Sequence, residues 1–181
     1  MKLFHHGLAL AAAAVFALPA QALTFSGDTT GGPLWDRPFE SLSGISALGS
    51  DVAYQVTPFT VTASGVYTFQ NTAVGGWDNF TFVYANAFNP AAPLANGVVG
   101  NDDNPGVGLS GFSPALTAGT SYFYVVTGFD PAEFGAYDVS VTGPGDVILT
   151  AIPEPGTYGL MGLGVAAVLL GARRRRERET A

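Results

Sequence analysis

Apolar and polar side chains alternate with a period of two residues through the middle of this chain. The alternation is found in short segments near residues 59–61, 67–69, 80–84, 122–126 and 137–142. A period of two is that of a β-strand, whose successive side chains point to opposite faces of a sheet. Clusters rich in Gly, Asn, Asp and Pro separate the segments and are typical of turns. The region shows no convincing 3.6-residue period, so helices are not expected there.

The spacing of these segments predicts an all-β domain of about seven to nine short strands, built as an antiparallel β-sandwich or jelly roll. Segment 122–126 is apolar on both sides and should be buried on both faces. Segment 137–142 carries polar residues at every second position and should have one face in water. The chain contains no cysteine, so its stability must come from the core and not from disulfides.

The first 22 residues have the composition of a secretory signal peptide. Lys2 lies in a short polar start, the run Leu8–Leu18 is apolar, and Ala20 and Ala22 supply the small residues that signal peptidase requires. The apolar run is too short for a membrane anchor, which needs about 20 residues. We expect cleavage after Ala22, so that the mature chain begins at Leu23.

Residues 151–181 form a second targeting segment. A Pro-Glu-Pro motif at Pro153, Glu154 and Pro155 precedes the apolar run Thr157–Ala172, which can form a single short transmembrane helix but is marginal for a permanent span. Four arginines follow the run and should stop translocation by remaining in the cytoplasm; they are Arg173, Arg174, Arg175 and Arg176. The sequence therefore divides into a signal peptide (1–22), a β-sandwich ectodomain (23–150) and a tail (151–181).

This order of motif, apolar helix and arginine cluster resembles the PEP-CTERM sorting signal. The resemblance implies recognition by an exosortase and a Gram-negative host that makes exopolysaccharide or biofilm. It also implies export across the inner membrane, transient anchoring there, and a final place at the cell surface or outside the cell. The alternative is a plain C-terminal anchor in which the Pro-Glu-Pro sequence occurs by chance.

The ectodomain resembles the bacterial pre-peptidase C-terminal family. The likeness rests on four segments in order, which are Asp78–Tyr84, Asn101–Gly106, Ala118–Tyr122 and Gly135–Tyr137. It implies a jelly-roll accessory module that is not itself catalytic. Such modules usually accompany a secreted enzyme domain, and this chain carries none beside it.

The ectodomain is acidic and lacks the side chains of several catalytic classes. Eleven acids against one base, Arg37, give residues 23–150 a formal charge of −10. Such a surface repels phosphate backbones, so nucleic acid is not an expected partner. The region contains no His, Cys or Lys. This inventory excludes Ser-His and Ser-Lys nucleophiles and cysteine proteases, and it disfavours a zinc site.

Asp78, Asn101, Asp102 and Asp103 are the candidate calcium ligands, with Asn104 beside them. Calcium takes six to eight oxygen ligands, and these side chains supply oxygens at close spacing. The alternative is a polar turn in which the Asn and Asp side chains hydrogen-bond to their own backbone.

Two further sets of residues suggest contact with sugars. Aromatic rings near turns could stack on a pyranose, although a place in the core is the commoner role; the rings are Trp35, Trp77, Phe88 and Phe112. Paired carboxylates could hydrolyse or eliminate a glycosidic bond, although solvated loop carboxylates are commoner; the candidates are Glu40 or Glu133 with Asp36 or Asp130.

The sequence thus indicates an exported, exosortase-sorted surface protein that is not an enzyme. Its expected role is structural or adhesive, in association with extracellular polysaccharide. The alternative function is a carboxylate-based glycosidase or polysaccharide lyase. Signal peptidase and exosortase are the expected processing partners.

Replacement of Glu154 by Ala should block processing of the tail. The flanking prolines hold Glu154 in an extended backbone that an enzyme can reach, and the short helix keeps it near the outer membrane face. We expect the variant to accumulate at full C-terminal length in the inner membrane, as measured by intact mass after fractionation. Normal release of the variant would show that the motif is incidental.

Overall fold

The computed structural model describes residues 21–150 of the 181-residue chain, and this part is built of β-strands. The strands are β1 (Gln21–Asp28), β2 (Leu34–Trp35), β3 (Val52–Val61), β4 (Gly65–Val66), β5 (Thr68–Ala73), β6 (Asn79–Ala85), β7 (Gly97–Asn101), β8 (Leu109–Phe112), β9 (Ala115–Leu116), β10 (Tyr122–Gly128), β11 (Ala136–Gly143) and β12 (Val147–Leu149). A 3-10 turn, η1 (Ala47–Gly49), precedes β3. Between residues 21 and 150 no helix combines the length and apolar character needed to cross a membrane.

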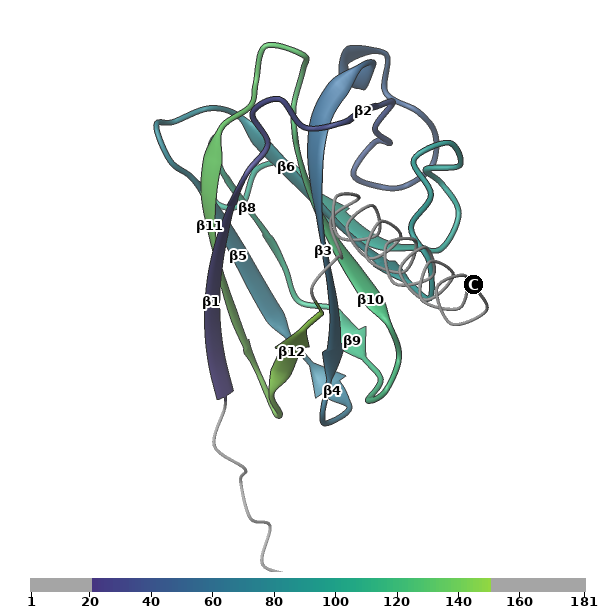
Figure 1. The fold of residues 1–181 in the computed structure, drawn as a ribbon, viewed down its shortest axis with the longest axis vertical. Coiled ribbons are helices and arrows are strands. Elements are labelled where there is room, and N and C mark those ends of the chain that lie inside the picture. Colours follow the sequence, from purple (N-terminus) through teal and green to yellow (C-terminus); the bar gives the residue numbers. More distant parts are fainter. Residues whose placement is uncertain (1–20, 151–181) are drawn as a thin grey trace, which may run out of the picture.

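The strands form two layered antiparallel sheets, which confirms the predicted β-sandwich (Figure 1). The smaller sheet has the order β1-β11-β5-β8. The larger sheet has the order β12-β3-β10-β6-β7, with β2 added beside β3. A short β4-β9 pair lies at the lower end of the molecule in Figure 1. The predicted segments near 80–84, 122–126 and 137–142 are strands β6, β10 and β11.

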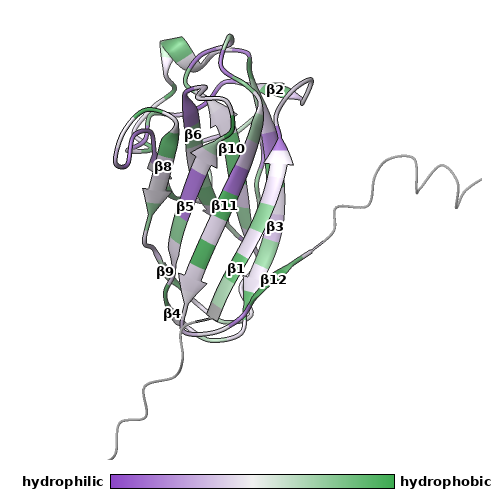
Figure 2. Ribbon diagram, turned by 90° about the vertical axis from the view of Figure 1, so that its left-hand side faces the viewer, coloured by the Kyte–Doolittle hydropathy of each residue, from purple (hydrophilic) through white to green (hydrophobic). Residues whose placement is uncertain are grey.

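The main core lies between the two sheets. Along β11, Tyr137, Val139 and Val141 are buried, whereas the residues between them are exposed. This alternation was predicted from the sequence, and Figure 2 shows it as bands of hydrophobic and hydrophilic colour along the strand. Aromatic rings from both sheets meet across the layer, as in the stacked pair Phe69 and Tyr124 at 5.4 Å between centroids. Such pairs stabilise a core beyond the area that they bury.

A second core covers the outer face of the larger sheet. There Phe82 and Tyr84 of β6 pack against Trp35 of β2, which the chain brings over the sheet before it enters β3. The Trp35 ring lies 5.4 Å from Phe88, which comes from the loop after β6, and 5.5 Å from Tyr54. Strands β6 and β10 are consequently buried on both faces. The sequence predicted this double burial for β10.

Arg37 fastens the segment between β2 and β3 to the end of β10. Its side chain is 2% exposed, and its guanidinium donates to the carbonyls of Gly128, Phe129 and Pro38. The guanidinium carbon also lies 4.2 Å from the centre of the Phe80 ring. Aromatic faces and carbonyl oxygens together replace the water that a buried cation loses. The sequence had identified Arg37 only as the single base of the ectodomain.

Both ends of the described chain leave from the lower half of the molecule in Figure 1, at the start of β1 and after β12. Ala22 lies in β1, opposite Thr142 of β11. The predicted signal peptide up to residue 20 and the predicted tail from 151, with its transmembrane helix, lie outside the described residues. Cleavage after Ala22 and the proposed domain boundaries therefore stay predictions.

Replacing Trp35 with Ala should destabilise the fold strongly. The change removes a buried ring and the hydrogen bond from Trp35 Nε1 to Thr127 Oγ1. Large-to-small changes of this kind cost about 3–5 kcal/mol. The matched control is Leu34→Ala in the same strand, because Leu34 is 59% exposed and should matter little. Urea unfolding curves measure both, and equal losses would contradict a packed second core.

Candidate functional site

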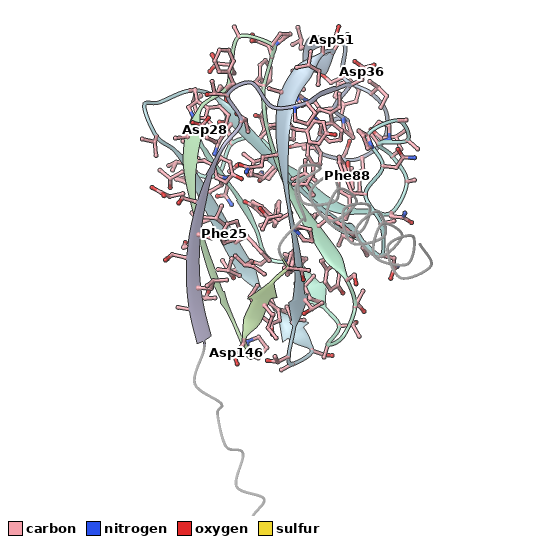
Figure 3. The ribbon with its side chains drawn as sticks, in the orientation of Figure 1. Phe25, Asp28, Asp36, Asp51, Phe88 and Asp146 are labelled. Carbon is pink, nitrogen blue, oxygen red and sulfur yellow. The ribbon has the colours of Figure 1, made fainter. Side chains whose placement is uncertain are left out.

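Acidic side chains gather at one end of the sandwich, opposite the end at which β1 begins. Figure 3 shows Asp28, Asp36 and Asp51 at this upper end and Asp146 at the lower end. Strand register adds further acids to the upper end, because β1, β5 and β10 finish there and β6 and β11 start there. We call this region the acidic end; it comprises Asp28, Asp36, Asp51, Asp78, Asp102, Asp103, Asp130 and Glu133.

Three of these acids form a carboxylate cluster. Asp78 immediately precedes β6, and Asp102 and Asp103 immediately follow β7. Since β6 and β7 pair antiparallel, with Thr81 opposite Asn101, these strand ends are neighbours. One carboxylate oxygen from each of the three acids lies within 4.8 Å of the others. The structure thus brings together three of the four residues that the sequence predicted as calcium ligands, and the geometry can hold a cation.

Crowding and burial change the acidity of this cluster. Burial, followed by the neighbouring charges of Asp78 and Asp103, raises the pKa of Asp102 to about 6. Burial and the charge of Asp103 likewise raise the pKa of Asp78. Oδ1 of Asp78 and Oδ1 of Asp102 are buried and accept no hydrogen bond from the described residues. Buried polar atoms normally have a partner, so these two oxygens are suited to bind a cation or a hydrogen-bond donor.

The two asparagines of the same segment have a different role. Asn101 Oδ1 accepts a hydrogen bond of 2.8 Å from the backbone N–H of Gly111 in β8. Asn104 donates its side-chain N–H to the Gly111 carbonyl at 3.0 Å. These bonds fix the connection between β7 and β8 and so hold Asp102 and Asp103 in place. The asparagines are therefore hydrogen-bonded to β8 and not to their own turn, whereas Oδ1 of Asp102 accepts no hydrogen bond from the described residues.

Most carboxylates considered for catalysis bind nearby backbone. Asp36 accepts from the N–H of Asp51 at 3.1 Å, and Asp130 accepts from the N–H of Ala132 at 2.7 Å. Glu133 accepts from the N–H of Asp78 at 2.6 Å, which steadies the carboxylate cluster.

Glu40 differs from the other candidates, because it lines a pocket together with Asp102. Sequence reasoning had proposed Asp36 or Asp130 as its partner. The pairing with Asp102 depends on the loop between β2 and β3 folding over the end of β7, which no local pattern reveals.

The aromatic residues considered for sugar stacking belong mainly to the cores. Trp35, Trp77 and Phe112 are at most 9% exposed, and Phe88 packs in the second core. The alternative of core packing is therefore the one that the structure supports. An exposed ring is found instead at Phe39, which lies beside Glu40. The sequence signal that could have indicated this exposed ring is that Phe39 is a single aromatic residue in a polar segment rich in turn residues.

The comparison with protein families identifies the C-terminal tail. The PEP-CTERM protein-sorting motif matches residues 151–176. The resemblance noted in the sequence is thereby confirmed, and the motif implies export and membrane-associated sorting by an exosortase. The chain accordingly carries a tail of the exosortase-sorting type. No curated protein matches its sequence.

Among solved structures, the chain is similar to several bacterial β-domains. The pre-peptidase C-terminal domain of collagenase from Bacillus anthracis has 16% identity and a TM-score of 0.41, with 66% of this chain and 87% of that one covered. The mitogen derived from Yersinia pseudotuberculosis has 12% identity and a TM-score of 0.37, with 68% of this chain and 86% of that one covered. The K3 cleaved adhesin domain of Lys-gingipain from Porphyromonas gingivalis has 19% identity and a TM-score of 0.32, with 71% of this chain and 91% of that one covered. The first of these structures belongs to the pre-peptidase C-terminal family that the ectodomain sequence resembles. Similarity at this level says nothing of activity.

The raised pKa of Asp102 predicts a stability that falls as the pH rises. Its pKa is about 6 in the fold and 3.8 as the ordinary value, so the folded state binds more protons between these two values. Unfolding free energy in a chelating buffer should therefore decrease from about pH 4 to about pH 6 and stay low above it. Asp102→Asn should lose this part of the pH dependence, whereas Asp146→Asn should keep it. Urea unfolding across this pH range measures the difference, and a wild-type profile in Asp102→Asn would contradict it.

Proposed function

We propose that this protein is a non-catalytic structural or adhesive component of the cell surface, associated with the exopolysaccharide of a biofilm matrix. The sorting motif at residues 151–176 supports a place at the surface. The absence of His, Cys and Lys from residues 23–150 removes the usual bases of Ser and Thr nucleophiles and the Cys nucleophile itself. The host is a Gram-negative bacterium, and signal peptidase removes residues 1–22 during export.

The carboxylate cluster carries the proposal that calcium takes part. Its three acids lie close together, two of their oxygens are buried without a partner, and burial and mutual repulsion raise the pKa of Asp102. Each of these features opposes ionisation of the three carboxyl groups when no cation is bound. A hard cation beside them would favour their ionised form. Calcium, which prefers oxygen ligands, would bind Asp78, Asp102 and Asp103 and relieve their repulsion.

The position of the acidic end suits a role in the matrix. The described chain ends at Thr150, whose N–H donates to the Pro58 carbonyl in the lower half of the sandwich, and the sorting tail follows directly. The acidic end lies at the opposite end of the domain from the start of β1 (Figure 3). It is therefore well placed to face away from the inner membrane while the tail is held there. After processing, bound calcium at this end would allow contact with sugar hydroxyls or with acidic polymer that the bare charge repels.

One observation favours a second function, a carboxylate-based glycosidase or lyase. Glu40 and Asp102 line the same pocket, and the pKa of Asp102 is raised to about 6. Glycosidic cleavage uses a carboxyl with a raised pKa as its general acid and a second carboxyl in the same cleft. Release of reducing ends or unsaturated sugars from the host's exopolysaccharide would identify this function.

Binding to exopolysaccharide should depend on calcium and on the carboxylate cluster. The secreted protein should co-sediment with exopolysaccharide purified from the host in about 1 mM calcium, a concentration at which extracellular sites are occupied. A chelator should release it. Asp102→Ala with Asp103→Ala should abolish the calcium-dependent part, and Asp36→Ala with Asp51→Ala is the control of equal charge at the same end.

The wild type and the same two double variants also test calcium binding in the absence of exopolysaccharide. Binding to the native state alone contributes about 1.4 kcal/mol at ten times Kd, which raises the melting temperature by a few degrees for a domain of this size. Calorimetry should show this rise in the wild type and in the control, but not in the cluster variant. An unchanged melting temperature in the wild type means that the cluster holds no calcium, and calcium-independent sedimentation separates the matrix role from the ion.

A further inference from the structure

Beside the carboxylate cluster lies a pocket that no sequence motif indicated. Its volume is about 360 Å³, within the range of small-molecule sites. One wall is the segment between β2 and β3, and the other is formed by the ends of β6, β7 and β10. Asp102 belongs to both the cluster and the pocket. A ligand in the pocket would therefore lie next to the proposed calcium ion.

One side of the pocket is apolar and prominent. Phe39 is 49% exposed and Leu48 is 60% exposed, and both line the pocket. Phe39 is held by a tight turn, in which its N–H donates to the Gly44 carbonyl and its carbonyl accepts from Leu42. The turn thus fixes the backbone that carries the ring before any ligand binds, so less conformational entropy remains to be lost. A half-exposed ring that lines a pocket is suited to cover the apolar face of a ligand.

The other side of the pocket accepts hydrogen bonds. Glu40 and Asp102 contribute carboxylates, and Ser41 and Ser46 contribute hydroxyls. Arg37 lies at the base, but its guanidinium already donates to three backbone carbonyls, so it is poorly placed to act as an anion receptor. The pocket consequently favours a ligand rich in hydroxyl donors and disfavours one that carries negative charge.

A close approach of the chain makes this arrangement rigid. A Cβ on Gly100 in β7 would lie 2.9 Å from the Glu40 carbonyl oxygen and 2.6 Å from the Phe82 ring. The absence of a side chain at Gly100 therefore lets the Glu40 backbone rest directly on the larger sheet. Because Glu40 and Asp102 approach the pocket from segments anchored on β6 and β7, their relative position is set by the sheet and not by a free loop.

We propose that this pocket binds one neutral hexose unit of a glycan, with its C–H face on Phe39 and its hydroxyls donating to Glu40 and Asp102. A sugar ring has one apolar face and an edge of hydroxyl donors, which match the two sides of the pocket. A uronic acid would bring its carboxylate against two others. The proposal rests on the matrix role argued above and names the sugar class and the residues that would recognise it.

Nuclear magnetic resonance titration of the secreted, processed protein tests this assignment. In calcium buffer, the probes are methyl β-D-glucopyranoside, methyl β-D-galactopyranoside and methyl α-D-mannopyranoside, with sodium glucuronate as the charged comparison. At least one neutral glycoside should shift the backbone amides of residues 37–48 and of Asp102, with a Kd of about 1–10 mM, as is expected of a single sugar in a shallow site. Glucuronate should bind at least tenfold more weakly.

Two variants and their matched controls locate the site. Phe39→Ala and Glu40→Ala should each weaken binding about tenfold or more, and both side chains are exposed, so the melting temperature should stay near that of the wild type. Phe134→Ala is the control for loss of an exposed ring, at 46% exposure outside the pocket, and Asp146→Ala is the control for loss of charge. Both controls should bind like the wild type.

The outcomes separate this inference from the function on which it rests. Failure of all three neutral glycosides to shift residues 37–48, or equal binding by Phe39→Ala, would overturn the assignment of the pocket. If exopolysaccharide still co-sediments with Phe39→Ala as with the wild type, the matrix role stands without this pocket. If a glycoside binds as expected but the wild type does not co-sediment, the pocket stands and the matrix role fails.

Discussion

The burial of Arg37 is the interaction on which the acidic end depends. A guanidinium can leave water only when its donors and its charge find partners, and here three backbone carbonyls and the rings of Phe80 and Phe129 supply them. These contacts hold the segment after β2 against the ends of β6 and β10. That segment closes the second core, forms one wall of the pocket and contributes to the burial of Asp102. A single buried cation thus organises a region that is otherwise crowded with negative charge.

Double burial of the larger sheet explains why the polar residues of interest lie in turns. Strands β6 and β10 have a core on each face, so their side chains are committed to packing. Ionised groups cannot enter either core without a partner. The acids are therefore placed mainly at strand ends, and antiparallel pairing brings the end of β7 beside the start of β6. Asp102 and Asp103 meet Asp78 for this reason, and their mutual repulsion is the basis of the proposed calcium site.

The candidate site could be predicted from the sequence only where its residues are close along the chain or flank recognisable strands. Asp102 and Asp103 are adjacent, and Asp78 directly precedes a segment with a clear period of two. Glu40 showed no such signal, because strands β3 to β7 separate it from Asp102 along the chain. The aromatic candidates were misleading in a related way: nearness to a turn in sequence does not distinguish a ring such as Trp35, which a loop covers, from Phe39, which remains exposed.

The sequence by itself determined the antiparallel sandwich, the strand segments that have a clear period of two, the sorting motif and the lack of His, Cys and Lys in the ectodomain. These features follow from local period, from composition and from short contiguous motifs. The tertiary structure decided which face of β6 is covered, where Arg37 lies and which acids share a pocket. Alternation shows on which side of a strand a residue lies, but what packs against that side comes from segments distant in the chain. Only the folded arrangement brings Phe39, Glu40 and Asp102 around one cavity.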